Sequence, residues 1–454
     1  GQGLASMLHG IPSGGTINNN ASRAEQSAYS SLFFHDDWRV TAKLTINAGV
    51  RWEYEAPITE RFNRTIRDFD FATASPVSAR ALANYARSPI PQVPVSGFHT
   101  AGGLVFAGAG GQPRELWSGD KNNVAPRVGV AYQLHRRTVL RAGYGFFYDV
   151  VGVDRFGVNQ GGFNQPTTLV PSLDNGQTFV ATLSNPFPNG VEVPAGAAGG
   201  LATFLGRDVS FFHGRPLNPY MQRWSFSIQR ELPPRLVMDA AYVGNRGTKL
   251  RANREMNPVP REYLSTSAVR DQPAIDLLGQ QVNNPFFGLP EFAGTARGNQ
   301  RINVGQLLRP YPHFGNITVD LPAGYSYFHS LQVAVEKRLG GGLSFQTSWT
   351  YSKFMEAAAY LNDTDSHLEK VVSDQDFPHR FVFSGIYELP LGRGKKWLSG
   401  AGAWTQGAAG GWQLQGWFEG QSGPALGFDN AIFTGDLKHI PLPLAERSAE
   451  RWFN

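Results

Sequence analysis

The chain has 454 residues and a formal charge of +5, with 41 Lys and Arg against 36 Asp and Glu, and it contains no cysteine. These values exclude disulfides and cysteine-based metal centres, and a mild positive charge without an arginine-rich run is not typical of a nucleic-acid-binding protein. No run of about 18 apolar residues is present, which excludes a transmembrane helix, and the 52 Gly and 30 Pro favour many turns and long loops.

The first strongly patterned stretch is LTINAGVRWEY, residues 44–54. Apolar and polar residues alternate along it with a period of two, which predicts a strand. Ile46 and Trp52 lie on one face, and Asn47 and Arg51 lie on the other. A weaker alternation predicts a preceding strand over 27–38, joined to it by a short turn. Soluble sandwiches and membrane barrels both alternate in this way, so the choice between them depends on how the pattern repeats.

Four further hairpins of the same kind follow along the chain. Their strands are predicted at 125–134 and 138–149, 221–231 and 236–247, 327–338 and 343–354, and 379–389 and 411–421. Long segments that look irregular separate them, at 56–123, 150–218 and 248–324, with a shorter acidic one at 355–378. Compact soluble domains rarely carry several such loops, whereas outer-membrane barrels alternate short periplasmic turns with long outer loops.

Aromatic residues gather near the loop ends of these strands, on the apolar face. An amphipathic ring is stable at a lipid–water boundary, although aromatic packing in a sandwich core is the simpler alternative. We expect an outer aromatic girdle formed by Trp52, Tyr54, Tyr144, Phe146, Trp224, Tyr242, Trp349 and Tyr351.

Several phrases resemble the barrel of TonB-dependent outer-membrane transporters of the Oar-like branch. Among them are FFHDDWRVTAKLTINAGVRWEY (33–54), VLRAGYGFFYD (139–149), QRWSFSIQREL (222–232) and HRFVFSGIYELPLGRGK (379–395). The resemblance implies a barrel of about 22 strands whose lumen holds a plug domain, on which an inner-membrane complex acts through TonB. Residues 1–454 contain neither a plug nor a TonB-contacting segment. We therefore expect one internal part of a barrel domain, without the plug and the terminal strands.

The polar face of the strands is expected to line a wet lumen. Arginines there can contact an anionic substrate or carboxylates of the plug, and simple solvation of the wall is the alternative. The lumen-facing candidates are Asn47, Arg51, Arg141, Arg223, Gln332, Glu336 and Gln346.

No pattern indicates catalysis. The aspartates of 362–376 are of the type that binds Ca²⁺, but a solvated outer loop is the favoured interpretation because no twelve-residue calcium loop is present. His35, Asp36 and Asp37 lack a second histidine that would make a metal site. Nucleophile elbows, phosphate loops and zinc-protease motifs are absent. We predict no catalytic, cofactor-binding or metal-binding residue and expect no enzyme activity.

The sequence therefore predicts an all-β chain that is part of an antiparallel outer-membrane β-barrel, with about ten strands and long extracellular loops. The expected function is energy-coupled uptake of a bulky nutrient such as a glycan, an oligopeptide or a metal chelate. The expected partners are outer-membrane lipid, the plug and the TonB complex, and not nucleic acid. A surface β-sheet adhesin or carbohydrate-binding protein and a passive porin are the alternatives. All neighbouring strands should pair antiparallel, and the first and last should be open edges.

Overall fold

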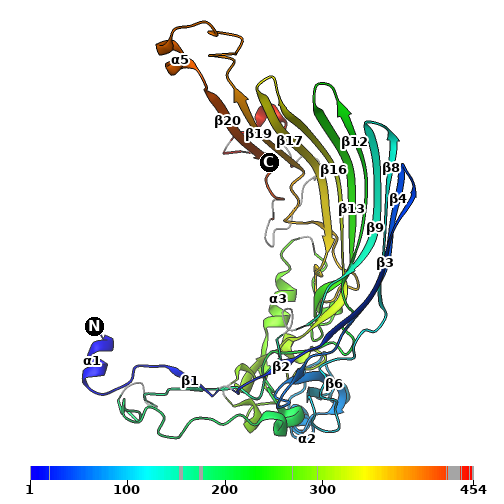
Figure 1. The fold of residues 1–454 in the computed structure, drawn as a ribbon. Helices are drawn as coiled ribbons and strands as arrows, with labels where there is room; N and C mark the ends of the chain where they lie inside the picture. The colour runs from blue at the N-terminus through cyan, green and yellow to red at the C-terminus, as the bar shows by residue number, and fades with distance from the viewer. Residues whose placement is uncertain are drawn as a thin grey trace.

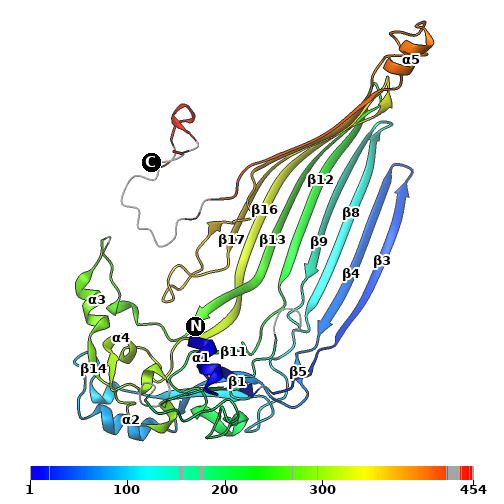
Figure 2. The same cartoon turned by 90° about the vertical axis from the view of Figure 1, so that its left-hand side faces the viewer.

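The computed structural model describes residues 2–19, 21–152, 157–172, 177–267, 269–293 and 295–425, with 427, 440, 442–448 and 450–451. A curved sheet dominates it, with short turns at one end and folded loops at the other (Figures 1 and 2). From Ser422 onward the sequence predicts a loop, and part of that segment lies outside the described residues.

Ten of the twelve strands of this sheet form an up-and-down meander, in which successive strands of the meander pair with each other. They are β3 (Tyr29–Thr41), β4 (Leu44–Glu55), β8 (Asn123–His135), β9 (Thr138–Tyr148), β12 (Tyr220–Leu232), β13 (Leu236–Glu255), β16 (Ile317–Gly340), β17 (Leu343–Ala357), β19 (His379–Glu388) and β20 (Gln413–Gln421). Each pair of neighbours is antiparallel. The ten predicted strands and their pairing are confirmed.

Two strands extend well beyond their predicted ends. β13 and β16 stay paired past the body of the sheet, through register shifts near Leu250. The extension of β16 also pairs with the short loop strand β11 (Val209–Phe211), and this pairing is parallel. The expectation that every pair would be antiparallel is therefore wrong for this loop strand. β18 (Val371–Val372) adds a short antiparallel pair to β17.

The sheet has two open edges. Its strand order begins at β20 and ends at β3, and among the described residues these two strands do not pair with each other. The prediction of open edges is confirmed.

The strand register separates an apolar face from a polar face, because directly opposite residues of an antiparallel pair point to the same side. One apolar row crosses eight strands through Trp38, Ile46, Val130, Ala142, Phe226, Tyr242, Leu331 and Tyr351. The adjacent row is made of Asp37, Asn47, Gly129, Gly143, Ser225, Val243, Ser330 and Ser352. Phe226 and Leu331 keep 46% and 43% of their surface exposed, so the apolar row is not a buried core.

The long connections contain most of the buried hydrophobic core, contrary to the expectation that they are irregular. Residues from 56–123, 150–218 and 248–324 pack into one cluster, which we call the loop core. Its largest members are Ile66, Tyr85, Leu104, Leu205, Phe286, Phe292, Phe314 and Ile317. The elements around it are β6 (Ile66–Ala74), α2 (Ser78–Tyr85), β7 (Ala101–Phe106), α3 (Gln272–Gly279), β14 (Gln281–Asn283), β15 (Arg301–Asn303) and α4 (Val304–Leu307).

Smaller elements complete the fold. α1 (Gln2–Leu8) is followed by β1 (Thr16–Asn19), which pairs with β10 (Gln165–Thr168), and β2 (Glu25–Gln26) pairs with β5 (Thr59–Glu60). α5 (Ala403–Ala409) lies in the connection between β19 and β20. Short 3-10 helices span Val95–Gly97, Gly196–Ala202, Arg261–Tyr263, Pro290–Phe292, Ala296–Gly298 and Leu444–Glu446. Among the described residues, no helix is long and apolar enough to cross a membrane.

Candidate ligand-binding site

The seven lumen-facing candidates all lie on the polar face of the sheet, as the register shows. Asn47 and Arg223 line one groove of about 420 Å³, together with His35 and Arg127. Glu336 and Gln346 line a second groove of about 620 Å³ across β16, β17, β19 and β20. The structure thus gathers four of the seven candidates into two grooves, and it adds Arg127 to the first.

The remaining candidates bond to neighbours on the same face. Arg51 forms an ion pair with Glu53, with Nε 2.8 Å from Oε1. Arg141 Nη1 donates to Gln229 Oε1 at 3.1 Å, and Gln332 Nε2 donates to Ser330 Oγ at 3.2 Å. These contacts fix the side chains along the wall. That this wall lines a lumen stays a prediction.

The eight girdle residues lie on the apolar face, and several contact one another. The rings of Trp52 and Tyr54 stack with centroids 6.2 Å apart, and those of Trp349 and Tyr351 with centroids 6.4 Å apart. Tyr144 and Phe146 meet edge to face at 5.7 Å. Such apolar bodies with polar tips suit a membrane boundary. The boundary itself stays a prediction.

The polar tips of the girdle have partners at the loop end of the sheet. The indole of Trp52 donates to the backbone oxygen of Lys121 at 2.8 Å, and the Tyr144 hydroxyl donates to Gln222 Oε1 at 2.9 Å. The Tyr242 hydroxyl lies 2.8 Å from Nδ1 of His329, a ring that also contacts Trp224. The rings are therefore held in fixed orientations.

Buried carboxylates fasten the loops to the ends of the strands. Glu55, the last residue of β4, accepts hydrogen bonds from the backbone N–H groups of Val151 and Gly152 at 2.6 and 2.5 Å, and from Asn218 Nδ2 at 3.1 Å. Buried backbone N–H groups need such partners. A carboxylate at the end of β4 thus organises the connection between β9 and β12.

Glu255 has the same role at the end of β13. One carboxylate oxygen accepts from the backbone N–H groups of Asn257 and Ile317 at 2.7 and 2.8 Å. Burial raises the pKa of Glu255, and these two bonds only partly oppose that effect. At Glu60 burial also acts to raise the pKa, but backbone N–H donors from Arg64, Ala24 and Phe62 outweigh it, so the pKa is lowered.

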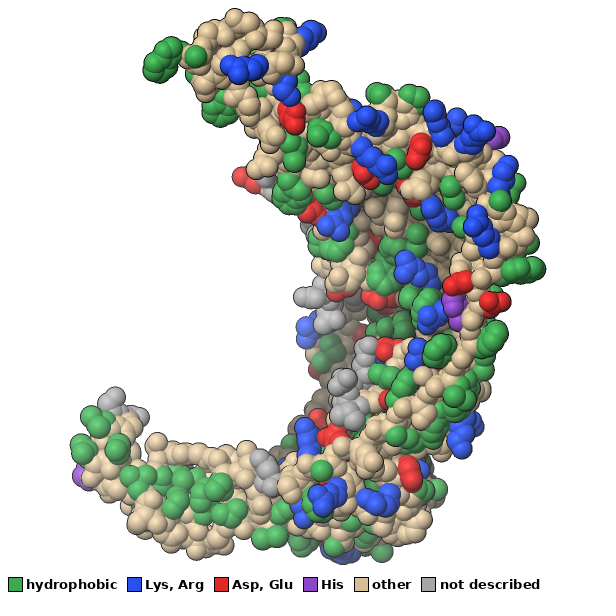
Figure 3. Space-filling view, viewed as in Figure 1, with side chains coloured by type: hydrophobic (Ala, Val, Ile, Leu, Met, Phe, Trp, Pro, Cys, Tyr) green, Lys and Arg blue, Asp and Glu red, His purple; other side chains and the backbone are tan. Residues whose placement is uncertain are grey.

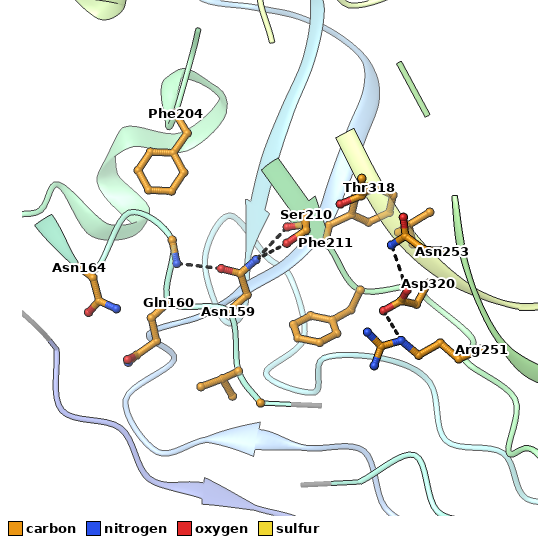
Figure 4. Close-up of a pocket in the computed structure, with 15 residues that line it drawn as sticks. Asn159, Gln160, Asn164, Phe204, Ser210, Phe211, Arg251, Asn253, Thr318 and Asp320 are labelled. Carbon is orange, nitrogen blue, oxygen red and sulfur yellow. Dashed lines mark hydrogen bonds and ion pairs between the residues drawn. The ribbon is translucent and has the colours of Figure 1, made fainter. Parts of the chain in front are cut away.

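A pocket of about 510 Å³ opens where the loop assembly meets the extended strands β13 and β16 (Figure 4). Asn159 occupies one side, where its Nδ2 donates to the backbone oxygen and the hydroxyl of Ser210 at 3.0 Å. On the other side Asp320 pairs with Arg251, with Oδ2 2.7 Å from Nε, and accepts from Asn253 at 3.1 Å. Two segments of the connection between β9 and β12, together with the strands β13 and β16, therefore shape one polar pocket.

The lining combines amides, hydroxyls and aromatic rings around a single ion pair. The other lining side chains include Gln160, Asn164, Thr318, Phe204, Phe211 and Phe212. An apolar pocket of about 170 Å³ shares Arg251 and Asp320 with it. Small numbers of placed polar groups beside aromatic surface are typical of small-molecule sites. We name this feature the loop pocket.

Sequence reasoning missed the loop pocket. Its residues come from 157–164, 204–212, 251–253 and 318–320, and no local spacing connects these segments. The single local signal is the amide-rich run at 159–165. Only the shared packing of the connections brings the lining together.

The acidic segment 362–376 holds loops in place. The buried carboxylate of Asp376 accepts from the backbone N–H of Phe354 at 2.6 Å and pairs with Lys353 Nζ at 2.6 Å. Asp365 lies 3.9 Å from Arg261 and accepts from the backbone N–H of Asn362 at 3.0 Å. Within the described part of the chain, no group of three or more His, Asp or Glu side chains is placed to hold a metal ion.

An antiparallel meander with one apolar and one polar face, short turns at one end and large loops at the other defines an outer-membrane β-barrel protein. The comparison with protein families agrees, because a model described as outer membrane beta barrel domain matches residues 1–450. The chain belongs to this family, and its location is the outer membrane. The recognition made from the sequence is confirmed.

The solved structures that match part of the chain include outer-membrane receptors and transporters. The alcaligin outer membrane receptor FauA from Bordetella pertussis has 10% identity and a TM-score of 0.36, over 88% of this chain and 38% of that one. The ferric-catecholate import receptor Fiu from E. coli K12 has 10% identity and a TM-score of 0.33, over 81% and 33%. The copper transporter OprC has 11% identity and a TM-score of 0.32, over 81% and 32%.

The chain thus spans well under half the length of these receptors. No curated protein matches its sequence.

Proposed function

We propose that the chain forms part of an energy-coupled outer-membrane receptor that takes up a bulky nutrient: a glycan, an oligopeptide or a metal chelate. The observation that carries this proposal is the loop core, in which the three connections between four successive hairpins fold on one another at one end of the sheet. Loops held on a rigid scaffold are where binding residues concentrate. A diffusion pore does not need an assembled surface of this kind at its mouth.

In this proposal the apolar face meets lipid and the polar face lines the lumen. The exposed apolar rows support the first part, because a soluble protein rarely leaves so continuous an apolar surface in water. The four arginines Arg51, Arg127, Arg141 and Arg223 support the second, since a wet lumen solvates them. Residues 1–454 are then part of a single barrel domain.

The proposed partners are a plug domain within the lumen and the TonB complex, as the sequence resemblance implies. The chain then binds and passes a substrate without making or breaking its bonds. The loop pocket is the proposed first contact for the nutrient. Its neutral balance of one arginine and one aspartate, with amides and rings around them, suits a ligand rich in hydroxyl or amide groups.

Two alternatives make different demands on the molecule. A sandwich-type adhesin or carbohydrate binder needs the apolar face as its core, yet Val50 on that face is 43% exposed. A passive porin shares the barrel but needs no energy source, so its uptake continues without coupling.

Growth measurements separate these possibilities. Cells with the intact parent protein as their sole uptake route are supplied with glycans, oligopeptides or ferric chelates as the limiting nutrient, with and without TonB. We expect growth on at least one nutrient that requires both the protein and TonB. Growth that requires the protein but not TonB identifies a porin. Absence of protein-dependent growth on every nutrient, with surface adhesion retained, identifies an adhesin.

A further inference from the structure

The connection between β19 and β20 differs from the other turns at its end of the sheet. The four other hairpins are closed by only residues 42–43, 136–137, 233–235 and 341–342. This one spans 389–412, includes α5 and projects beyond the neighbouring turns (Figures 1 and 2). A tight turn is sufficient to close an antiparallel hairpin. The additional residues of this connection are therefore not needed to close the hairpin. We call it the basic connection.

The basic connection has a defined structure. Its base is closed by a hydrogen bond from the backbone N–H of Leu389 to the backbone oxygen of Trp412 at 2.9 Å. Lys395 Nζ pairs with Glu388 at 2.8 Å. The side chain of Gln406 donates to the backbone oxygen of Leu398 at 2.5 Å, and the indole of Trp412 donates to that of Ala408 at 2.8 Å. These contacts hold the backbone of the connection in a defined shape.

That surface combines exposed aromatic groups with positive charge. Trp404 is 94% exposed and Trp397 is 54% exposed. The segment 389–412 carries Arg393, Lys395 and Lys396 and no acidic residue. Lys396 lies over the ring of Trp397 at 5.5 Å, and hydrophobic and basic side chains gather on this projecting end in Figure 3. In water, a tryptophan exposed to this degree on an ordered segment loses the favourable burial that its size allows.

We propose that the basic connection docks on the anionic phospholipid surface of the leaflet at the turn end of the sheet. Indole rings and cations together fit that surface, because the ring enters the headgroup layer while the charge meets phosphate. The connection also continues directly from the apolar face of β19 and β20, where Phe383, Tyr387 and Leu414 are exposed. An acidic protein would attract the cations equally, but it would not explain that continuity.

A dye at position 404 tests the proposal. The chain has no native cysteine, so Trp404→Cys in the intact parent protein gives one labelling site. The labelled protein is folded into vesicles of phosphatidylcholine, alone or mixed with phosphatidylglycerol, that carry a nitroxide quencher on the headgroup. We expect strong quenching that increases with phosphatidylglycerol and decreases with added salt, because salt screens surface charge.

A charge variant and a matched position give the controls. Arg393→Gln with Lys396→Gln should lower the ratio of docked to undocked dye on the order of tenfold. A dye at Arg136→Cys, in the short turn of β8 and β9, should be quenched less and should not respond to the charge variant. Folding of each variant is checked by heat-modifiable migration on a gel. If the charge variant does not fold, the dependence of quenching on charge is measured by salt titration of the protein that retains Arg393 and Lys396.

Several outcomes would overturn the proposal. A dye at 404 that stays unquenched in both lipid mixtures excludes docking on lipid. If the quenching changes neither with phosphatidylglycerol, nor with salt, nor in the Arg393→Gln, Lys396→Gln variant, an anionic surface is excluded as the partner. A dye that stays in water in vesicles but is shielded in native outer membranes identifies a protein partner instead.

Discussion

His313 is fully buried beside the loop core. It packs against Phe314 with ring centroids 4.7 Å apart, and burial lowers its pKa from 6.5 to about 4. The folded-state pKa lies below the unfolded-state value. Between pH 6.5 and about pH 4 the unfolded chain therefore binds a proton more readily than the folded chain does. The stability that the neutral ring contributes is complete above pH 6.5 and is lost as the pH falls to about 4.

We predict that His313→Phe makes the loops more resistant to acid. This lowering of the His313 pKa corresponds to a loss of about 3 kcal/mol in the free energy of unfolding as the pH falls from 6.5 to about 4. The measurement is the urea midpoint at each pH, read from a dye on Ser88→Cys in the detergent-solubilised parent. The exposed His367 serves as control, and His367→Phe should leave the acid dependence unchanged. If the urea midpoint of the His313→Phe variant falls with acid as much as that of the unaltered protein, the assignment of the acid dependence to His313 is wrong.

Alternation in the sequence places individual side chains correctly where strands are regular. It put Asn47, Arg223 and Gln346 on one face because a period of two is a local property. On β3 the pattern is weaker, and the register puts Phe33 on the polar face and Asp36 on the apolar face. No period links Asn159 to Asp320, so the loop pocket has no signature of this kind.

The strands are the elements that the sequence defines best, and they allow a test of the two faces. Ile46 and Val333 lie on the apolar face, and Asn47 and Gln332 on the polar face. Arginine on the lipid face costs about 2–4 kcal/mol at the bilayer midplane. We predict that Ile46→Arg and Val333→Arg lower the amount of folded, heat-modifiable parent protein, whereas Asn47→Arg and Gln332→Arg barely change it.

A second measurement, of dye quenching, shows whether the apolar face contacts lipid. A dye on Ile46→Cys should be quenched by a nitroxide in the acyl chains, and a dye on Asn47→Cys should not. Equal quenching at both positions would reject the assignment of the faces, even if the arginine variants behave as predicted.

The connections are the elements that sequence reasoning missed. The apolar residues of 56–123 have no sustained period, and they pack with apolar residues of the other connections. Tyr85 and Phe98 stack with centroids 4.1 Å apart, but Phe98 also contacts Phe286 from a connection far along the chain. The order of these loops therefore comes from tertiary packing, which a strand or helix period does not report.

At the scale of the whole molecule, the sheet and the loop core should lose structure separately. Phe286 is fully buried at the centre of the core, and Phe287 beside it is 52% exposed. Replacing a buried phenylalanine by alanine costs about 3–5 kcal/mol. We predict that Phe286→Ala exposes the loops of the parent protein to protease in native membranes, whereas Phe287→Ala leaves them protected.

The barrel should remain heat-modifiable in both variants, because among the described residues of the ten meander strands only the extended end of β16 reaches the loop core, and the ladder in the body of the sheet pairs strand with strand. Loss of heat modifiability in Phe286→Ala would show instead that sheet and loops unfold together. Unchanged protease resistance in that variant would mean that the core does not order the loops.

The shared core also limits how this surface can diverge. An insertion that moves Phe286 disturbs its contacts with a different connection, so the three loops are not free to change length one at a time. Antigenic or substrate-driven variation should then concentrate in parts that lie outside the packing, such as the exposed stretch 188–193. Exchange of loops between relatives should succeed only when all three connections are transferred as a set.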